Sequence, residues 1–531
     1  MNIAIDSNFP GGAVEKARFE NPNTIYFRAP KNGSPQSLWY NFRIDGGKGK
    51  VLRLVQQQLE DVLGLLESRT YAFTVPVVKH GDEASWQRIE ESAVSFKKNP
   101  LEYEFTFLKE TDTTYVAFSY PYTFDNLNAF LEKHRSNEYL NLEHIGTTAE
   151  GRPYPCLMVG APENDLTQIV IITARHHAGE VSGSYVLEGI IESFLEQLRS
   201  SRLETAAIAL LVFPLVDLDS VETGRYGKGR PPVDFNRDWT ACPLHEEIRL
   251  IQSRIEKAAA SSPLLLYMDL HAPQPGGTTY IVPARASSYE TSLYEQIWEL
   301  YGQVEKSIEG FSTCRIKDLD PFALNWGQEA YQHTSVQYQA RRYQIPALTL
   351  ETSYHYDSSK QLLDPVKWQG IGKKLWETVI GSFCKGARFG DMTFSPIPSG
   401  EIGWRYWEMV SLPDNCTLEE NTSVMTIHSS AGGKAFVTFR TYIPTTEKAS
   451  VIIQYSSGDK NLSLEVTTYY YKDRIVYDRY DTQYLSFIPG EHTFYPMRNG
   501  ALEDWNSYRI AVKVDGLVGS LSVQIQVTSG S

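Results

Sequence analysis

The chain has 531 residues, of which 42% are apolar and 21% are charged, and its formal net charge is −14. This length is too great for one ordinary domain, and the composition is typical of a folded protein and excludes a disordered one. The acidic balance argues against nucleic acid or an anionic membrane as the main partner, because phosphates would be repelled. No apolar run approaches the roughly 18 residues that cross a bilayer. Five scattered cysteines and the lack of an N-terminal signal predict a cytoplasmic protein.

Residues 1–118 form the first predicted domain, which is rich in β-structure. Short runs with strand character are separated by Gly, Pro and Asn; they include TIYFRA, SLWYNFRIDG, AFTVPVV and LEYEFTFL. Residues 51–69, VLRLVQQQLEDVLGLLESR, interrupt these runs with a helical pattern. We expect Trp39, Tyr40 and Phe42 to lie in the core of this domain and not on a binding surface.

Residues 119–390 form the second predicted domain, where apolar runs of strand length alternate with amphipathic helical patterns. The strands are QIVIITA, AAIALLVFPLV, LLLYMDLHA and IPALTLETS, and the helical patterns cover residues 181–198 and 244–260. This alternation predicts an α/β fold with a mixed, mainly parallel sheet covered by helices on both faces. In such sheets the functional site forms at the carboxyl ends of the strands.

Residues 391–531 form the third predicted domain, a C-terminal β-sandwich. Alternating strands return here, such as KAFVTFRTYI, ASVIIQYSS and LSLEVTTYYYK. The aromatic residues of 468–484 have the chemistry to stack on sugars, but alternating aromatics in a strand are more typical of core and cross-strand pairs.

Ionisable side chains follow the predicted strands of the second domain at the point where each strand ends. His177 and Glu180 follow QIVIITA, and His271 ends LLLYMDL. Two imidazoles and one carboxylate leave a fourth position for water, which is the arrangement of a catalytic zinc site and not of a closed structural one. Asp269, on the same side of its strand as His271, either orients an imidazole or is structural.

Glu351 ends the strand IPALTL and is predicted to be the general base of the same site. Zinc lowers the pKa of its water and polarises a carbonyl. A free carboxylate beside it can take the proton of that water and pass it to the leaving amine.

The segment VDFNRDW, residues 233–239, supplies a second kind of chemistry. The guanidinium of Arg237 can clamp a carboxylate with two bonds, and the amide of Asn236 adds a directed hydrogen bond. The alternative is a structural arginine in a loop ion pair.

The order HAGE, PLVDLDSV, DFNR, DLHA and TLETS resembles the zinc carboxypeptidases of the carboxypeptidase A superfamily. SLWYNFRIDGGKGK and YVAFSYPYTFDNL are similar to the small β domain and junction of the cytosolic branch. The resemblance implies three zinc ligands, a general base and two residues that bind the terminal carboxylate of the substrate; these are His177, Glu180 and His271, then Glu351, then Asn236 and Arg237.

The chain departs from the family pattern at the turn and at the arginine that polarises the scissile carbonyl. VDLD replaces the family's NPDG turn. A gapless comparison puts Gly227 at the arginine position, and we favour Arg230 over Arg225 as its replacement.

Two further positions concern the substrate. Tyr331 lies about where carboxypeptidases keep a mobile tyrosine that covers the substrate, with Tyr338 as the competitor. Val336 lies near the position where glutamate-removing members have a basic residue, so a preference for an acidic side chain stays open.

The sequence therefore predicts a metallocarboxypeptidase with one zinc per chain, which hydrolyses the C-terminal peptide bond of peptides or proteins through a zinc-bound water that Glu351 activates. The alternative is an amidase or deacylase of the same fold that acts on cell-wall peptides or N-acyl amino acids. A third hypothesis is an inactive carbohydrate- or protein-binding scaffold. Neither nucleic acid nor a membrane is an expected partner, and the sequence does not define the oligomeric state.

Overall fold

The computed structural model describes most of the chain, with gaps. The described residues are 3–34, 38–57, 74–82, 84–98, 101–160, 168–200, 208–272, 279–284, 288, 333–357, 359–384, 407–411, 416–421, 424–439, 443–444, 447–456, 462–472, 475–495 and 507–529. They divide into two compact units. The first contains the described residues up to 283 and from 348 to 384; the second contains 284, 288, 333–347 and 407–529. The predicted domain boundaries at 118 and 390 stay a prediction.

The N-terminal part of the first unit is built from two five-stranded sheets. One sheet has the order β1-β4-β10-β6-β7, formed by Ala4–Asp6, Asn41–Asp45, Thr113–Ala117, Val77–His80 and Gln87–Arg88. The other has the order β2-β3-β5-β9-β8, formed by Glu15–Asn21, Thr24–Arg28, Val51–Gln57, Leu101–Leu108 and Val94–Lys98. The predicted β-rich domain is confirmed.

The helix predicted for residues 51–69 is wrong for the first seven residues of that range. Val51–Gln57 form strand β5, which pairs with β3 in parallel and with β9 in antiparallel fashion. Leu52 and Leu54 point into the core, and the neighbouring strands satisfy the backbone groups, so tertiary pairing overrides the helical pattern. The rest of that segment lies outside the described residues.

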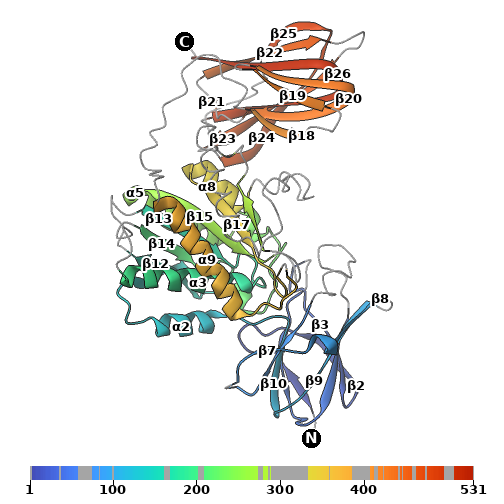
Figure 1. Cartoon of the computed structure of the whole chain (residues 1–531), viewed down its shortest axis with the longest axis vertical. Helices are drawn as coiled ribbons and strands as arrows, with labels where there is room; N and C mark the ends of the chain where they lie inside the picture. The colour runs from blue at the N-terminus through green and yellow to red at the C-terminus, as the bar shows by residue number, and fades with distance from the viewer. Residues whose placement is uncertain are drawn as a thin grey trace. The chain divides into compact units, whose positions relative to one another are not determined.

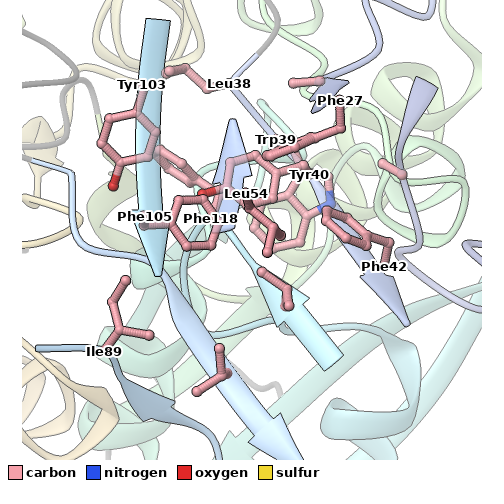
Figure 2. Close-up of a cluster of buried hydrophobic side chains, with 14 of the residues drawn as sticks. Phe27, Leu38, Trp39, Tyr40, Phe42, Leu54, Ile89, Tyr103, Phe105 and Phe118 are labelled. Atoms are coloured by element: carbon pink, nitrogen blue, oxygen red, sulfur yellow. The ribbon is translucent and has the colours of Figure 1, made fainter. Parts of the chain in front are cut away.

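Aromatic side chains fill the core of this N-terminal part (Figure 2). Trp39, Tyr40 and Phe42 are all buried there, as predicted, and Phe27 and Phe105 pack against Tyr40 with ring centroids 5.1 and 6.4 Å away. Aromatic rings contribute large apolar areas to such a core.

The other part of the first unit is built around a seven-stranded mixed sheet with the order β11-β12-β14-β13-β15-β17-β16 (Figure 1). Its strands are Leu140–Thr147, Pro153–Gly160, Ile208–Phe213, Gln168–Ala174, Leu264–His271, Ala347–Glu351 and Tyr280–Pro283 in that order. Strand β13 pairs in parallel with β14 and β15, whereas β11–β12, β12–β14 and β16–β17 are antiparallel. The sheet is mixed, as predicted, and its described parallel pairs lie at the centre.

Helices accompany this sheet, and two of them, Ser182–Arg199 and Glu246–Ser261, match the helical patterns predicted for residues 181–198 and 244–260. They are α2 (Phe124–Lys133), α3 (Ser182–Arg199), α4 (Leu218–Glu222), α5 (Glu246–Ser261) and α9 (Pro365–Cys384). Helix α3 packs against α9 and against β12, β13 and β15 (Figure 1). Helix α5 packs against β11. Strand β13 is buried at every position after Gln168, which explains its continuous apolar run.

Among its described residues, the second unit contains helix α8 (Ser335–Tyr343) and a nine-stranded sheet. The strands β18 to β26 are Trp407–Ser411, Cys416–Asn421, Val424–Phe439, Ile443–Pro444, Glu447–Ser456, Leu462–Lys472, Ile475–Phe487, Gly490–Phe494 and Ser507–Ser529. β26 pairs with β20, β21, β22 and β23, all in antiparallel fashion. The C-terminal region is therefore β-structured, as the alternating pattern predicts.

Candidate functional site

The loop that leaves β13 carries His177 and Glu180. The chain takes a left-handed conformation at Arg175 (φ 67°), and the buried guanidinium of Arg175 fixes the loop by donating to the carbonyl of Ala178. A non-glycine residue in this conformation costs energy and is held by its surroundings. At Gly179 a Cβ would lie 2.2 Å from Cδ2 of Tyr226, so only glycine lets that ring approach the loop.

His271, at the end of β15, meets these two residues. Nδ1 of His177 lies 2.8 Å from Oε1 of Glu180, and Nδ1 of His271 lies 2.7 Å from Oε2 of the same carboxylate. The backbone N–H of Ala272 also donates to Oε2, at 3.0 Å. All three side chains are buried, and one ligand atom of each lies within 4.8 Å of the others. The residues of the predicted zinc set therefore come together.

Each imidazole of this set is held on its far side by a second carboxylate. Nε2 of His177 lies 3.2 Å from Oδ1 of Asp234, and Nε2 of His271 lies 2.8 Å from Oδ2 of Asp269. A carboxylate that accepts from Nε2 fixes the ring and leaves Nδ1 free for a metal ion. Asp269 thus contacts the imidazole of His271, which fits one of the two roles that the sequence left open for it, and Asp234 contacts His177 in the same way.

His176, Asp269 and His271 form a second group with metal-type donors, but the hydrogen bonds of His176 argue against an ion there. The Nε1–H of Trp239 donates to Nε2 of His176 at 3.0 Å. Indole nitrogen is only a donor, so Nε2 accepts and the proton of the neutral ring is on Nδ1. That Nδ1–H donates to Oδ1 of Asp269 at 2.8 Å, which leaves neither nitrogen for a metal ion.

The charges of the cluster also favour a cation. Burial disfavours the charged form of His177 and His271, but the facing carboxylates outweigh burial and raise the pKa of both imidazoles. Burial also disfavours the charged form of Glu180, which by itself would raise its pKa. The charges of His177, Lys228 and His271 outweigh burial and lower the pKa of Glu180 well below its usual value. The buried carboxylates thus favour positive charge beside them, which a divalent cation can supply in place of imidazole protons. The residues present therefore fit zinc.

Glu351 ends β17, the strand next to β15 in the sheet. The N–H of Thr352 donates to the carbonyl of His271 at 2.8 Å, which brings the ends of the two strands together. The carboxylate is buried, and its Oε2 has no hydrogen-bond partner in the part of the chain that the structure describes. Burial raises the pKa of Glu351 to about 7, although the charge of His271 opposes this.

The DFNR segment forms a single 3₁₀ turn, Phe235–Arg237, beside the cluster. Asp234 starts the turn by accepting the N–H of Asn236 at 2.8 Å. Nδ2 of the buried Asn236 lies 3.0 Å from Nε2 of His271. The guanidinium of Arg237 donates to the carbonyl of Asn236 at 2.8 Å, and none of the described carboxylates pairs with it.

Arg230 and Arg225, the two candidates for the carbonyl-polarising arginine, have partners outside the cluster. Arg230 donates to Oδ1 of Asp217 at 3.3 Å and lies 4.8 Å from the ring centroid of Phe235. Arg225 donates to Glu150 at 3.0 Å. The predicted role of Arg230 stays a prediction.

Lys228, two residues before Arg230 and next to Gly227, was not among the residues predicted from the sequence. Its Nζ donates to Oε1 of Glu180 at 3.1 Å, and its side chain is mostly buried. Although burial lowers the pKa of Lys228, the charge of Glu180 outweighs it and raises the pKa above its ordinary value. The only signal in the sequence was the motif GKGRPP itself, which offers a second cation beside the expected position.

Tyr331, the predicted mobile tyrosine, lies outside the described residues. Val336 and Tyr338 lie in α8, which belongs to the second unit.

Comparisons with known proteins agree with the site geometry. Residues 5–121 match the cytosolic carboxypeptidase N-terminal domain, and residues 127–262 match the zinc carboxypeptidase family. The segment that carries most of the site is thus similar to the zinc carboxypeptidases. The second matched segment, residues 127–262, contains His177, Glu180 and the DFNR turn. His271 and Glu351 lie beyond it, and the structure brings them next to His177 and Glu180.

Similar proteins are cytosolic carboxypeptidases. Cytosolic carboxypeptidase 6 of Mus musculus is 25% identical over 268 residues, which cover 46% of this chain and 48% of the relative. Cytosolic carboxypeptidase 6 of Caenorhabditis elegans is 21% identical over 333 residues, which cover 56% of this chain and 71% of the relative. The chain spans about half the length of the first of the curated relatives it matches. The predicted cytoplasmic location is in line with the family of the N-terminal domain.

Among solved structures, the metallo-carboxypeptidase from Burkholderia cenocepacia has the same fold. It aligns with a TM-score of 0.61 and 18% identity, and covers 72% of this chain and 100% of its own. In the described part of the chain, no helix is both long and apolar enough to cross a membrane.

Proposed function

We propose that the protein is a zinc-dependent carboxypeptidase that removes the C-terminal residue of peptides or proteins and binds one zinc ion per chain. The observation that carries this proposal is the meeting of His177, Glu180 and His271 beside Glu351 at the ends of the sheet strands. The family match of the chain supports the same activity.

The three ligands would hold zinc, which when bound lowers the pKa of water and polarises a carbonyl. Glu351 takes the proton of the attacking water and then delivers it to the departing amine. A pKa raised by burial suits both steps, because the same carboxylate must accept a proton and release it near neutral pH.

Asn236 and Arg237 bind the terminal carboxylate of the substrate. Arg237 is not paired with a carboxylate among the described residues, so its guanidinium can form the two parallel bonds that a carboxylate accepts. Asn236 lies against His271 and thus links the binding of the carboxylate to the reacting end of the site.

Lys228 is better supported than Arg230 as the cation that stabilises the oxygen of the scissile carbonyl. Lys228 contacts a zinc ligand, whereas Arg230 would have to leave Asp217 to reach the cluster. A fixed positive charge beside the developing oxyanion lowers the barrier. Tyr331 is retained as a proposed substrate-covering residue.

A mixed library of peptides with free and amidated C-termini tests the activity. The proposal predicts that single residues leave from free C-termini only, and that Arg237→Ala removes this preference. Arg135→Ala, which changes an exposed arginine paired with Glu132 on the surface, is the control and keeps wild-type kinetics. Equal hydrolysis of free and amidated peptides, or release of acyl groups instead of residues, would favour the amidase hypothesis.

A further inference from the structure

The core of the N-terminal domain continues into the segments that carry the site. The cluster of buried side chains around Tyr40 and Phe118 (Figure 2) also contains four residues from the catalytic part: Val181, Tyr226, Ala272 and Tyr354. Val181 follows Glu180, and Ala272 follows His271. The core of the N-terminal domain therefore packs directly against the two segments that carry Glu180 and His271.

Arg88, at the end of β7, adds several hydrogen bonds to this contact. Its guanidinium donates to the carbonyl of Tyr354 at 2.7 Å, to the carbonyl of Leu363 at 2.9 Å and to Nδ1 of His355 at 2.7 Å. The planar group also lies 5.1 Å from the ring centroid of Tyr120. Guanidinium only donates, so the neutral ring of His355 carries its proton on Nε2.

These acceptors lie on the two arms of one loop that begins directly after Glu351. The N–H of Leu363 donates to the carbonyl of His355 at 2.7 Å, and Tyr356 forms an antiparallel bridge with Leu362. Arg88 joins the arms at the base of this loop. At the other end, Thr352 is tied to the carbonyl of His271.

Arg88 does not act as part of an ion pair in this contact. Among the described residues no carboxylate lies within 4.0 Å of its guanidinium, and its acceptors are neutral. Burial lowers the pKa of Arg88 to about 10, so the charge is kept at a cost. The feature that Arg88 supplies is the rigid fork of donors, which fits several fixed acceptors at once.

We propose that Arg88 is a positioning residue for Glu351: it lets the N-terminal domain fix the loop of residues 352–363 and, through it, the general base. This inference rests on the proposed function. A base must stay within hydrogen-bond reach of the proton it takes, and a misplacement of about 1 Å can cost roughly 100-fold in rate. Loosening the loop therefore lowers kcat more than it raises KM.

Three variants test the role of Arg88. Arg88→Met removes every donor, whereas Arg88→Lys keeps the charge but loses the fork. Arg53→Met is the control, because Arg53 lies in the other N-terminal sheet and binds Glu104 at a partly exposed position. Hydrogen exchange of the amides in residues 352–363, zinc content and steady-state kinetics are measured for each.

The expected result is faster exchange in residues 352–363 and a kcat lowered at least about tenfold in Arg88→Met, with KM within roughly twofold and zinc retained. Arg88→Lys gives an intermediate kcat and carries the test if Arg88→Met does not fold. Arg53→Met changes neither the exchange of residues 352–363 nor kcat. Unchanged exchange in that loop, or faster exchange with wild-type kcat, would overturn the role of Arg88. A wild-type protein that removes no residue from any peptide contradicts the proposed function instead, and the exchange measurement still decides whether Arg88 holds the loop.

Discussion

Nδ1 of His271 lies 2.7 Å from Oε2 of Glu180, although the two residues are 91 positions apart in the chain. The strand order explains the contact, because β13 and β15 are neighbouring parallel strands whose carboxyl ends meet at one edge. Glu351 joins them from β17, the next strand in the sheet. The ends of three strands thus bring the proposed zinc ligands and the proposed general base together.

Replacing the base separates catalysis from metal binding. We expect Glu351→Gln to keep zinc and the fold but to lower kcat by a factor of about 10² to 10⁴, because the amide cannot accept the proton of water. Zinc content and kcat on a free-C-terminal peptide measure the two effects. Wild-type turnover in a zinc-loaded variant would remove Glu351 as the base.

The carboxylates behind the imidazoles should control zinc affinity. We expect Asp234→Asn and Asp269→Asn each to weaken zinc binding by a factor of about 10 to 100, because Nε2 of the ligand imidazole loses a charged acceptor. Competition with a chromogenic chelator measures the affinity. Asp125→Asn, at an exposed position in α2, serves as the matched control. Wild-type affinity in both site variants would show that these contacts do not orient the ligands.

Two cations compete for the role of carbonyl stabiliser. We expect Lys228→Met to lower kcat by a factor of about 10² to 10³ with zinc retained, because the positive charge beside the site is lost. Arg230→Met should lower kcat far less, since its guanidinium binds Asp217. Parallel kinetic measurements on the two variants compare them. A larger loss in Arg230→Met would restore the prediction from sequence.

Lys109, a buried lysine in the N-terminal domain, should make the free energy of unfolding vary with pH in the alkaline range. Nζ of Lys109 donates to the carbonyls of Ile44, Thr111 and Asp112, at 2.8 to 3.0 Å. Burial lowers its pKa from 10.5 to about 8. Between these values the unfolded chain binds more protons than the folded one, so this residue makes the free energy of unfolding rise with pH across that window.

Urea denaturation of the wild type and Lys109→Met at a series of pH values isolates this contribution. The stability of the wild type relative to the variant should be constant below pH 8 and should increase from about pH 8 to 10.5. Parallel curves through this range would contradict a lowered pKa of Lys109.

The strands of the sheet and the polar side chains that meet at their ends were predictable from sequence, because burial leaves a local signal in the order of residues. QIVIITA became β13 with the predicted bounds, and the continuous burial of that strand is the reason for its continuous apolar run. His177, Glu180, His271 and Glu351 were predicted because polar groups at the ends of apolar runs need a partner.

The remaining features depend on partners that are distant in sequence. The start of β5 resembled a helix, and pairing with β3 and β9 decided otherwise. Lys228 and Arg230 are both cations on one loop, and nothing in their order tells which one meets Glu180 and which meets Asp217. The contact of Arg88 with the loop after Glu351 joins residues separated by more than 260 positions.

An anomalous-difference map of a crystal grown with zinc, recorded on both sides of the zinc absorption edge, tests the central claim most directly. The account predicts one strong peak per chain, within bonding distance of His177, Glu180 and His271 and next to the carboxylate of Glu351. No peak among these side chains in crystals of active protein, or a peak bounded by His176 and Asp269 in its place, would contradict it.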